Sequence, residues 1–148
     1  MIKIETKFKM NVPNFDFSDD LMEVARTGFI PIMQKNMESS TAIDGSTLPP
    51  NAPATLKRKA VKNHGNKPLF DTGKLFSSFI AIAMGKNKVM VTLASERKNI
   101  GSYLQYDGVV SRMGINFYRF FGVNKEMELS ARDFMNRKVG ERINEGRK

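Results

Sequence analysis

The spacing of apolar residues changes along the chain, and it predicts a short strand followed by a long helix. Ile2, Ile4 and Phe8 alternate with charged residues, as they do on a strand with one buried face. From Ser18 onward, apolar residues recur at steps of three and four, which is the period of one helix face. This face is made of Leu21, Val24, Ala25, Gly28, Phe29, Ile32, Met33 and Met37.

Local signals refine this helix. Ser18 is expected to cap its start, because a serine oxygen can accept a hydrogen bond from the free N–H groups of the first turn. Asp19 and Asp20 follow, where the positive end of the helix dipole favours acidic side chains. Pro31 lies inside the pattern and has no N–H to donate, so we expect it to kink the helix or to divide it.

The next stretch is rich in turn residues and predicts a long loop at about 44–67. Residues 44–51 combine Asp, Gly, Ser, Pro and Asn, which favour turns. Pro53 suits the first turn of a short helix at 55–62, and residues 64–66 should end it. The loop has few large apolar side chains to bury, so we expect it to be mobile in the free monomer and ordered by a partner.

A second short helix and a hairpin are predicted next. Asp71 or Thr72 is expected to cap a helix through 75–79. Two arms, 80–84 and 89–93, then carry alternating apolar residues, and glycine and asparagine occur in the turn between them. The apolar residues of the arms are Ile80, Ile82 and Met84 on one side, and Val89, Val91 and Leu93 on the other.

Towards the C-terminus, aromatic segments precede a long helix. Residues 101–108 mix aromatic and polar side chains, and residues 116–123 are rich in aromatic ones, which fits either a strand or a buried loop. Apolar residues then recur every four positions, between acidic residues near the start and basic residues near the end, as the helix dipole favours. These positions are Met127, Ala131, Met135, Val139 and Ile143.

This order of elements predicts one α+β domain over residues 1–148. We expect a small antiparallel β-sheet packed with a long N-terminal helix and a C-terminal helix, together with the long extended loop. The regular alternation of strands and helices that builds a parallel sheet is missing. The predicted core contains Leu21, Val24, Phe29, Ile32, Phe76, Phe79, Val91, Phe134 and Val139.

Charge and composition narrow the possible partners. The formal net charge of +9 favours nucleic acid, an acidic protein surface or anionic lipid, although solubility alone would also explain it. The chain has no cysteine, which excludes disulfides, thiol nucleophiles and cysteine-bound metals. No segment reaches the roughly 18 apolar residues of a membrane-spanning helix, so we expect no membrane anchor.

The residues give little support to an enzyme. His64 is the single histidine, and a catalytic dyad would need a serine or an acid beside it in space; a solvated loop side chain is the favoured interpretation. The acidic residues are scattered, and no phosphate-binding glycine pattern occurs, so we expect no metal and no cofactor. Residues 71–74 are similar to an aspartyl-phosphate motif, but residues 68–70 make a poor preceding strand. A small hydrolase or transferase is therefore the third of three hypotheses.

Basic residues suggest an interface. The run at 57–59 could contact phosphates, which leaves a nucleic-acid-binding module as the alternative function. Residues 117–121 combine aromatic side chains with Arg119. These aromatic residues could stack on the bases of single-stranded nucleic acid, or they could belong to the core or to a subunit interface. The candidate interface residues are Lys57, Arg58, Lys59, Lys62 and Arg112.

Four stretches, DGSTLPPNAPATLKRK, KPLFDTGKLFSSF, GSYLQYDG and RFFGV, resemble the virion morphogenesis proteins of tailed bacteriophages and prophages. These are tail-completion and head–tail joining proteins. Their Leu-x-Asp-Thr-Gly-x-Leu-x-x-Ser element is matched by Leu69, Asp71, Thr72, Gly73, Leu75 and Ser78. The resemblance covers about residue 41 to the C-terminus.

Two further elements of that family match more loosely. Tyr103, Gln105 and Gly108 resemble a Tyr-Ala-x-x-His-Gln-x-Gly element, without its histidine and with a different tyrosine spacing. Arg119, Phe121 and Gly122 resemble an Arg-x-Phe-Leu-Gly element, but Ile115 and Asn116 stand where that family usually has prolines. The motif residues to which the resemblance assigns a structural role are Asp71, Thr72, Gly73, Leu75 and Gly122.

The resemblance implies a non-enzymatic assembly protein of the virion tail or neck, assembled in the cytoplasm of a bacterial host. Such proteins form closed rings, commonly of six copies, that cap the tail tube or connect it to the head. The implied partners are further copies of the chain, the tail tube and the neck or portal-side proteins, with passing contact to DNA. The loop at 44–67 would then be an arm onto a neighbour; a plain surface loop is the alternative.

Overall fold

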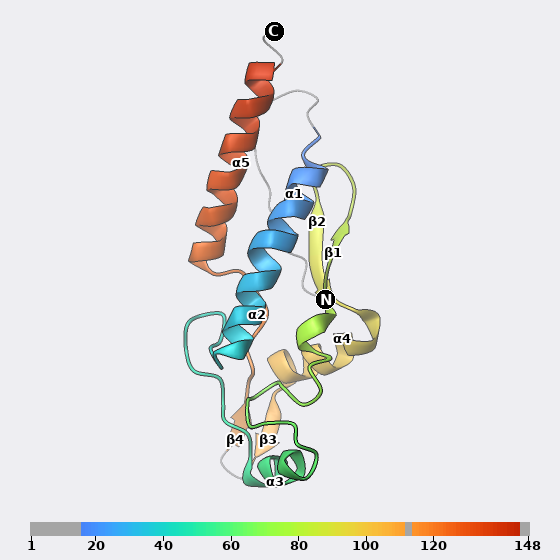
Figure 1. The fold of residues 1–148 in the computed structure, drawn as a ribbon, viewed down its shortest axis with the longest axis vertical. Coiled ribbons are helices and arrows are strands. Elements are labelled where there is room, and N and C mark those ends of the chain that lie inside the picture. The colour runs from blue at the N-terminus through green and yellow to red at the C-terminus, as the bar shows by residue number, and fades with distance from the viewer. Residues whose placement is uncertain (1–15, 112–113, 146–148) are drawn as a thin grey trace.

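The computed structural model describes residues 16–111 and 114–145. The strand predicted at 2–8 and the interface candidate Arg112 lie outside the described residues. The described chain is mixed helix and strand, with a C-terminal helix and an antiparallel two-stranded sheet, which confirms the predicted α+β class. Figure 1 shows the first helical stretch between the C-terminal helix and the hairpin.

The first helical stretch is divided, as Pro31 predicts. It consists of α1 (Ser18–Val24), a π-helical turn η1 (Ala25–Phe29) and α2 (Ile30–Glu38). Pro31 lies in the first turn of α2, and the π turn directly precedes it. Because proline has no N–H, the regular α-helical ladder is interrupted here, and a π turn is one way to accommodate that interruption.

The predicted cap at Ser18 is wrong. Ser18 is the first helical residue, and Phe17 occupies the cap position without a side-chain hydrogen bond to the helix. The carboxylate of Asp16 instead accepts hydrogen bonds from the Ser18 backbone N–H, at 2.9 Å, and from its hydroxyl, at 2.6 Å. Asp19 lies in the first turn as expected.

The hairpin is confirmed, and the helix predicted to precede it is wrong. β1 (Phe79–Ala83) pairs antiparallel with β2 (Val89–Leu93), with Phe79 opposite Leu93 and Ala81 opposite Val91. Only a short 3₁₀ turn, η2 (Phe76–Ser78), precedes β1. Phe79 is extended and buried against β2, and this pairing outweighs the helical continuation that its spacing suggested.

The second half contains a helix that the apolar pattern did not predict. α4 (Ser95–Ser102) continues into a π turn, η3 (Tyr103–Asp107), and a second two-stranded sheet pairs β3 (Val109–Ser111) with β4 (Gly114–Asn116). The aromatic stretch that follows is irregular after Asn116, and it buries Tyr118, Phe120 and Phe121 while Phe117 and Val123 are exposed. This stretch is therefore a loop, not a strand. The predicted last helix is α5 (Lys125–Glu145).

The core lies where α1, η1 and α2 meet the hairpin, the aromatic stretch and α5 (Figure 1). Phe79 stacks on Phe121 with ring centroids 5.8 Å apart and meets Phe120 edge-on at 6.3 Å. Every predicted core residue belongs to this cluster: Leu21, Val24, Phe29, Phe79 and Val91 are buried, and Ile32, Phe76, Phe134 and Val139 are partly buried against it.

Candidate functional site

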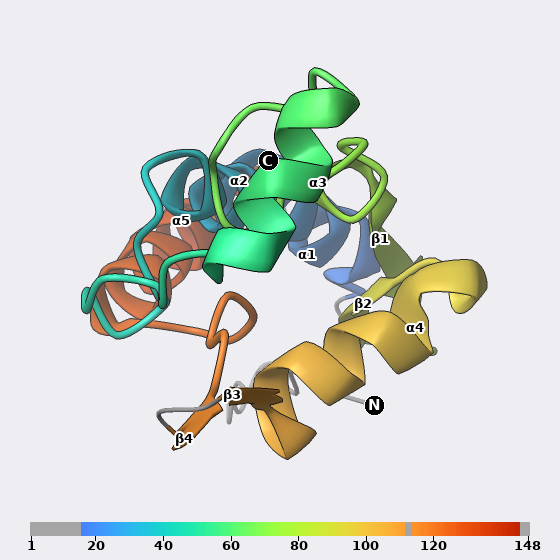
Figure 2. The same cartoon turned by 90° about the horizontal axis from the view of Figure 1, so that it is seen from below.

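The basic run folds into α3 (Pro53–Val61), a short helix at one end of the molecule (Figure 1). Pro53 occupies its first turn, as predicted. Figure 2, which views the molecule from this end, shows α3 crossing in front of α1 and α2. The segment 44–67 is attached to the domain through Leu48, which is 2% exposed and whose N–H donates a hydrogen bond to the carbonyl of Ser40 at 2.8 Å. Within the segment, Asn51 Nδ2 donates a hydrogen bond to the carbonyl of Asn66 at 2.8 Å.

The helix divides the basic candidates between two faces. Lys57 and Arg58 are exposed on α3, and Lys62 is exposed directly after it. Lys59 points to the other side and is only 2% exposed. Successive helical residues point about 100° apart, so consecutive cations cannot all share one surface. The exposed set, Lys57, Arg58 and Lys62, is called the α3 patch below.

Lys59 links α3 to the chain that follows it within the segment 44–67. Its ammonium donates a hydrogen bond to the carbonyl oxygen of Lys67 at 2.7 Å, which holds the returning chain against α3. Burial lowers the pKa of Lys59, an effect that the nearby Asp71 carboxylate partly counteracts. Lys59 is thus a structural residue of this segment and is not part of the exposed patch.

His64 and Asp71 form a pair that the sequence did not predict. Nδ1 of His64 lies 2.7 Å from Oδ1 of Asp71, and the histidine side chain is about a quarter exposed. The hydrogen bond with His64 lowers the pKa of Asp71, and the positive charges of Arg58 and Lys62 act in the same direction. The predicted cap at Asp71 or Thr72 is wrong, because only the 3₁₀ turn η2 follows and no side chain caps it. The Asp71 carboxylate instead holds His64, just after α3, against the Asp-Thr-Gly turn.

The Asp-Thr-Gly element forms a tight turn that leads into the hairpin. Gly73 has a φ of +73°, a conformation that side chains with a Cβ rarely adopt. Its carbonyl accepts hydrogen bonds from the backbone N–H of Ser77 at 3.0 Å and from its hydroxyl at 3.1 Å. Leu75 is buried in the core. Gly73 and Leu75 thus set the path of the chain here, while Thr72 remains exposed.

The helix α3 and the Asp-Thr-Gly turn meet at one cavity of about 370 Å³, called the basic cavity below. Four basic side chains, from α3, the Asp-Thr-Gly turn and α4, contribute to its lining: Arg58, Lys59, Lys74 and Arg97. Asp71, Thr72, Gly73 and Leu75 line it as well. The structure therefore brings two of the predicted interface residues together with four of the five motif residues.

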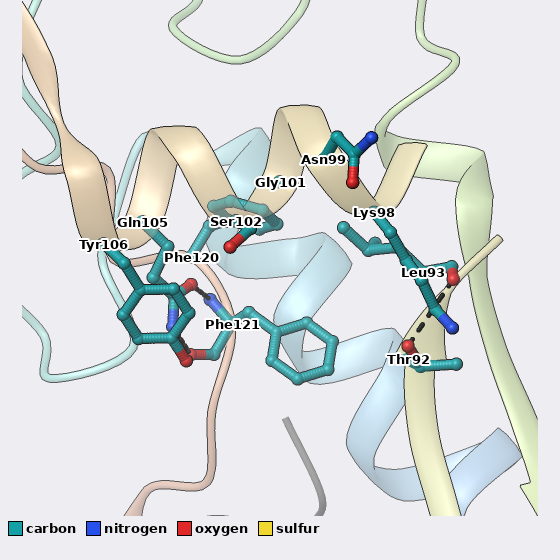
Figure 3. A pocket seen from close by; sticks show the side chains of 10 residues that line it. All are labelled: Thr92, Leu93, Lys98, Asn99, Gly101, Ser102, Gln105, Tyr106, Phe120 and Phe121. Carbon is teal, nitrogen blue, oxygen red and sulfur yellow. Dashed lines mark hydrogen bonds between the residues drawn. The ribbon is translucent and has the colours of Figure 1, made fainter. Parts of the chain in front are cut away.

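The two weaker family-like elements also meet, at a second cavity of about 180 Å³ (Figure 3). It lies between the end of β2, the α4–η3 helix and the aromatic stretch. Gln105 reaches across and bonds to the backbone of Phe121 twice, at 2.6 Å and 2.9 Å, as the dashed lines in Figure 3 mark. Gly122 follows and lies against Ile43, whose N–H donates to the carbonyl of Arg119.

The described residues offer no metal site and no membrane span. Nowhere in 16–111 or 114–145 do three or more His, Asp or Glu side chains gather closely enough to hold a metal ion. Among these same residues, no helix is long and apolar enough to cross a bilayer. A scan against protein-family models, a search of curated proteins and a search of solved structures each found no match to this chain.

Proposed function

We propose that this chain is a non-enzymatic structural protein of a tailed bacteriophage or prophage, which completes the tail or joins it to the head as a closed ring. The observation that carries this proposal is that four stretches, from the Asp-Gly segment at 44–45 to the aromatic stretch, resemble elements of that family and follow one another in the same order. The contacts of the structure are consistent with it, because Asp71 and Gly73 meet the basic helix, and Gln105 meets Phe121, within one domain.

A ring of identical copies needs two different complementary patches on each copy. The α3 patch is one candidate, since its three cations are exposed at one end of the molecule. The hairpin offers another: Ile80, Ile82 and Met84 are 38%, 37% and 49% exposed. Neighbouring exposed apolar residues of this kind often mark a protein contact.

The test of the ring is direct. The purified protein is expected to form closed rings by negative-stain electron microscopy and a discrete oligomer by light scattering. Ile82→Asp should reduce assembly, because the contact would remove water from the new charge. Ile82 is exposed in the single chain, so the substitution should leave the fold unchanged. Leu129→Asp is the matched control, since Leu129 is also exposed but lies on α5.

The test of the biological role uses the virus or prophage that encodes the chain. Disruption of the gene should cause separate heads and tails, or tails of faulty length, to accumulate, and the intact gene should restore joined particles. Infectious, fully joined particles without the gene product would show that the proposed role is wrong.

The α3 patch also favours one alternative, a nucleic-acid-binding module. Exposed Lys57, Arg58 and Lys62 could neutralise phosphates, and the affinity for DNA would then fall steeply with salt. A triple Lys57→Gln, Arg58→Gln and Lys62→Gln variant would lose that affinity. Tight, strongly salt-dependent DNA binding by a protein that forms no ring would favour this alternative.

A further inference from the structure

The basic cavity has more basic than acidic side chains among its lining residues. Arg58, Lys59, Lys74 and Arg97 line it, and Asp71 is the single carboxylate among its lining residues. Asp71 is already engaged with His64 at 2.7 Å. An anionic group that entered the cavity would therefore meet several cations and one carboxylate that already has a partner.

Arg97 provides the most specific feature of this cavity. In the described part of the chain, its Nε is buried and has no hydrogen-bond partner. A buried donor without a partner is costly, and native proteins leave few of them. The guanidinium is planar and can donate two parallel hydrogen bonds to a carboxylate, so Arg97, which lines the cavity, is suited to an acidic ligand there.

The walls of the cavity distinguish between possible anions. Leu69, Phe70, Ile100 and Leu104 contribute apolar surface beside the cations. A nucleic-acid backbone gains little from such walls, since it is polar along its whole length. A peptide that carries an aspartate or glutamate next to an apolar side chain would use both. The volume of about 370 Å³ lies within the range of about 300–1,000 Å³ that is usual for ligand pockets.

We propose that the basic cavity is a docking site for an acidic, apolar-bearing segment of a different protein. A carboxylate of that segment binds the guanidinium of Arg97, and an adjacent apolar side chain packs on Leu69 and Phe70. The identity of the partner as another virion protein rests on the proposed function, but the peptide chemistry of the cavity does not.

Charge favours a different protein over a second copy of this chain. An acidic partner would be attracted to this cationic cavity, whereas a second copy, with the same net charge of +9, gains nothing from long-range attraction there and would have to rely on other contacts. The exposed acidic residues at the start of α5 are also partly neutralised within the chain, since Glu128 pairs with Arg132 at 3.3 Å. These acidic residues of a second copy would therefore bind the four cations of the basic cavity only weakly.

A library of short random peptides tests the proposal, with the full-length protein as bait. Enriched peptides should combine aspartate or glutamate with a neighbouring aromatic or branched apolar residue. The best of them, labelled with a fluorophore, should bind Arg97→Gln about 10–100-fold more weakly than the unchanged protein, which is the effect of losing a charged hydrogen-bond pair. Arg97→Lys should bind with intermediate affinity, because it keeps the positive charge but loses the planar pair of N–H donors that can bind both oxygens of a carboxylate.

Two further variants guard against misfolding and charge effects. Lys74 is exposed at the cavity, so Lys74→Gln should weaken binding without unfolding the domain, even if Arg97→Gln proves unstable. Arg137 is exposed on α5, away from the basic cavity, and Arg137→Gln should leave the affinity unchanged. Equal peptide affinity in Lys74→Gln, Arg97→Gln and the unchanged protein would overturn the proposal, as would a library without enrichment.

Other occupants give different results. If duplex DNA binds and Arg97→Gln weakens it by the same factor, the cavity is a phosphate site and the proposal is wrong. If Arg97→Gln abolishes self-association, the occupant is a second copy and the proposal is again wrong. Failure of the proposed virion role is separable, because it would leave joined particles in the gene disruption while the peptide affinity and its loss in Arg97→Gln persist.

Discussion

The side-chain amide of Gln105 pairs with the backbone of Phe121 as one strand pairs with another. Gln105 Nε2 donates to the Phe121 carbonyl at 2.6 Å, and the Phe121 N–H donates to Gln105 Oε1 at 2.9 Å. Phe121 belongs to no strand in the described chain, so this amide supplies the partners that a sheet would otherwise provide. The pairing fixes the position of Phe121, whose ring stacks on Phe79.

Replacing this amide should destabilise the domain. Gln105→Leu keeps a similar volume but leaves the N–H and carbonyl of Phe121 without partners, so we expect a loss of about 1–3 kcal/mol in the free energy of unfolding. Urea unfolding followed by circular dichroism measures it. Asn136→Ala, at an exposed amide of α5, is the control and should change stability by less than about 0.5 kcal/mol. Equal midpoints for the two variants would contradict the structural role of Gln105.

Periodic patterns predicted the long elements well and missed the contacts between irregular ones. The helical stretch from Ser18 and the helix at 125–145 repeat apolar residues over several turns, which tertiary context rarely overrides. α4 lacks that signal, because Ile100 is its one large aliphatic residue and is 44% exposed. The bond between Gln105 and Phe121 joins irregular segments, and no local spacing encodes it.

The site was predictable in its residues but not in its geometry. The sequence singled out Lys59 and Asp71, yet it could not show that one is buried and that the other pairs with His64. Consecutive basic residues such as Lys57, Arg58 and Lys59 suggest one patch in a sequence, whereas helical geometry turns Lys59 inward. Nothing in the sequence singled out Arg97, because the feature that distinguishes it, a buried Nε without a hydrogen-bond acceptor, depends on the fold.

Two glycines in helices should respond to alanine in opposite directions. A Cβ at Gly101 would lie 2.2 Å from Cδ1 of Leu93, which is buried in the core, so Gly101→Ala should cost about 1–3 kcal/mol. A Cβ at Gly140, within α5, would meet nothing within 4 Å, so Gly140→Ala should stabilise by about 0.5–1 kcal/mol. Thermal unfolding of both variants checks this, and a gain from Gly101→Ala would show that Leu93 can move aside.

An ion pair joins the first and last helices and should contribute to stability. Nη2 of Arg142 lies 2.6 Å from Oδ2 of Asp20, which is 8% exposed, and the guanidinium packs over the ring of Phe17 at 4.7 Å. Arg142→Leu leaves this carboxylate largely buried without its partner, so we expect a loss of about 1–3 kcal/mol. Asp20→Asn should recover part of that loss in the double variant.

The exposed pair of Arg132 and Glu128 provides the comparison. Arg132→Leu should change stability by less than about 0.5 kcal/mol, since exposed ion pairs contribute little. If chemical denaturation shows equal losses for Arg132→Leu and Arg142→Leu, the pair between Arg142 and Asp20 has no special structural role.

The pair of His64 and Asp71 should make stability depend on acid pH. The hydrogen bond with His64 holds the pKa of Asp71 below its ordinary value of 3.8, so the unfolded chain takes up a proton here at a higher pH than the folded one. The stabilising contribution is therefore fully present above about pH 5 and is lost as the pH falls through 3.8 and then through the folded pKa. In Asp71→Asn this contribution is absent at every pH.

The difference in urea midpoint between the unchanged protein and Asp71→Asn should accordingly shrink from pH 5 to pH 2. Asp16 and Asp44 also have lowered pKa values, through hydrogen bonds from Ser18 and Ser46, but they are common to both proteins and cancel in the difference. His64→Ala should reduce the same pH-dependent difference, because it removes the hydrogen bond, the largest cause of the lowered pKa of Asp71, and leaves the smaller effects of Arg58 and Lys62. A difference that stays constant over this range would show that the hydrogen bond between His64 and Asp71 does not form in solution.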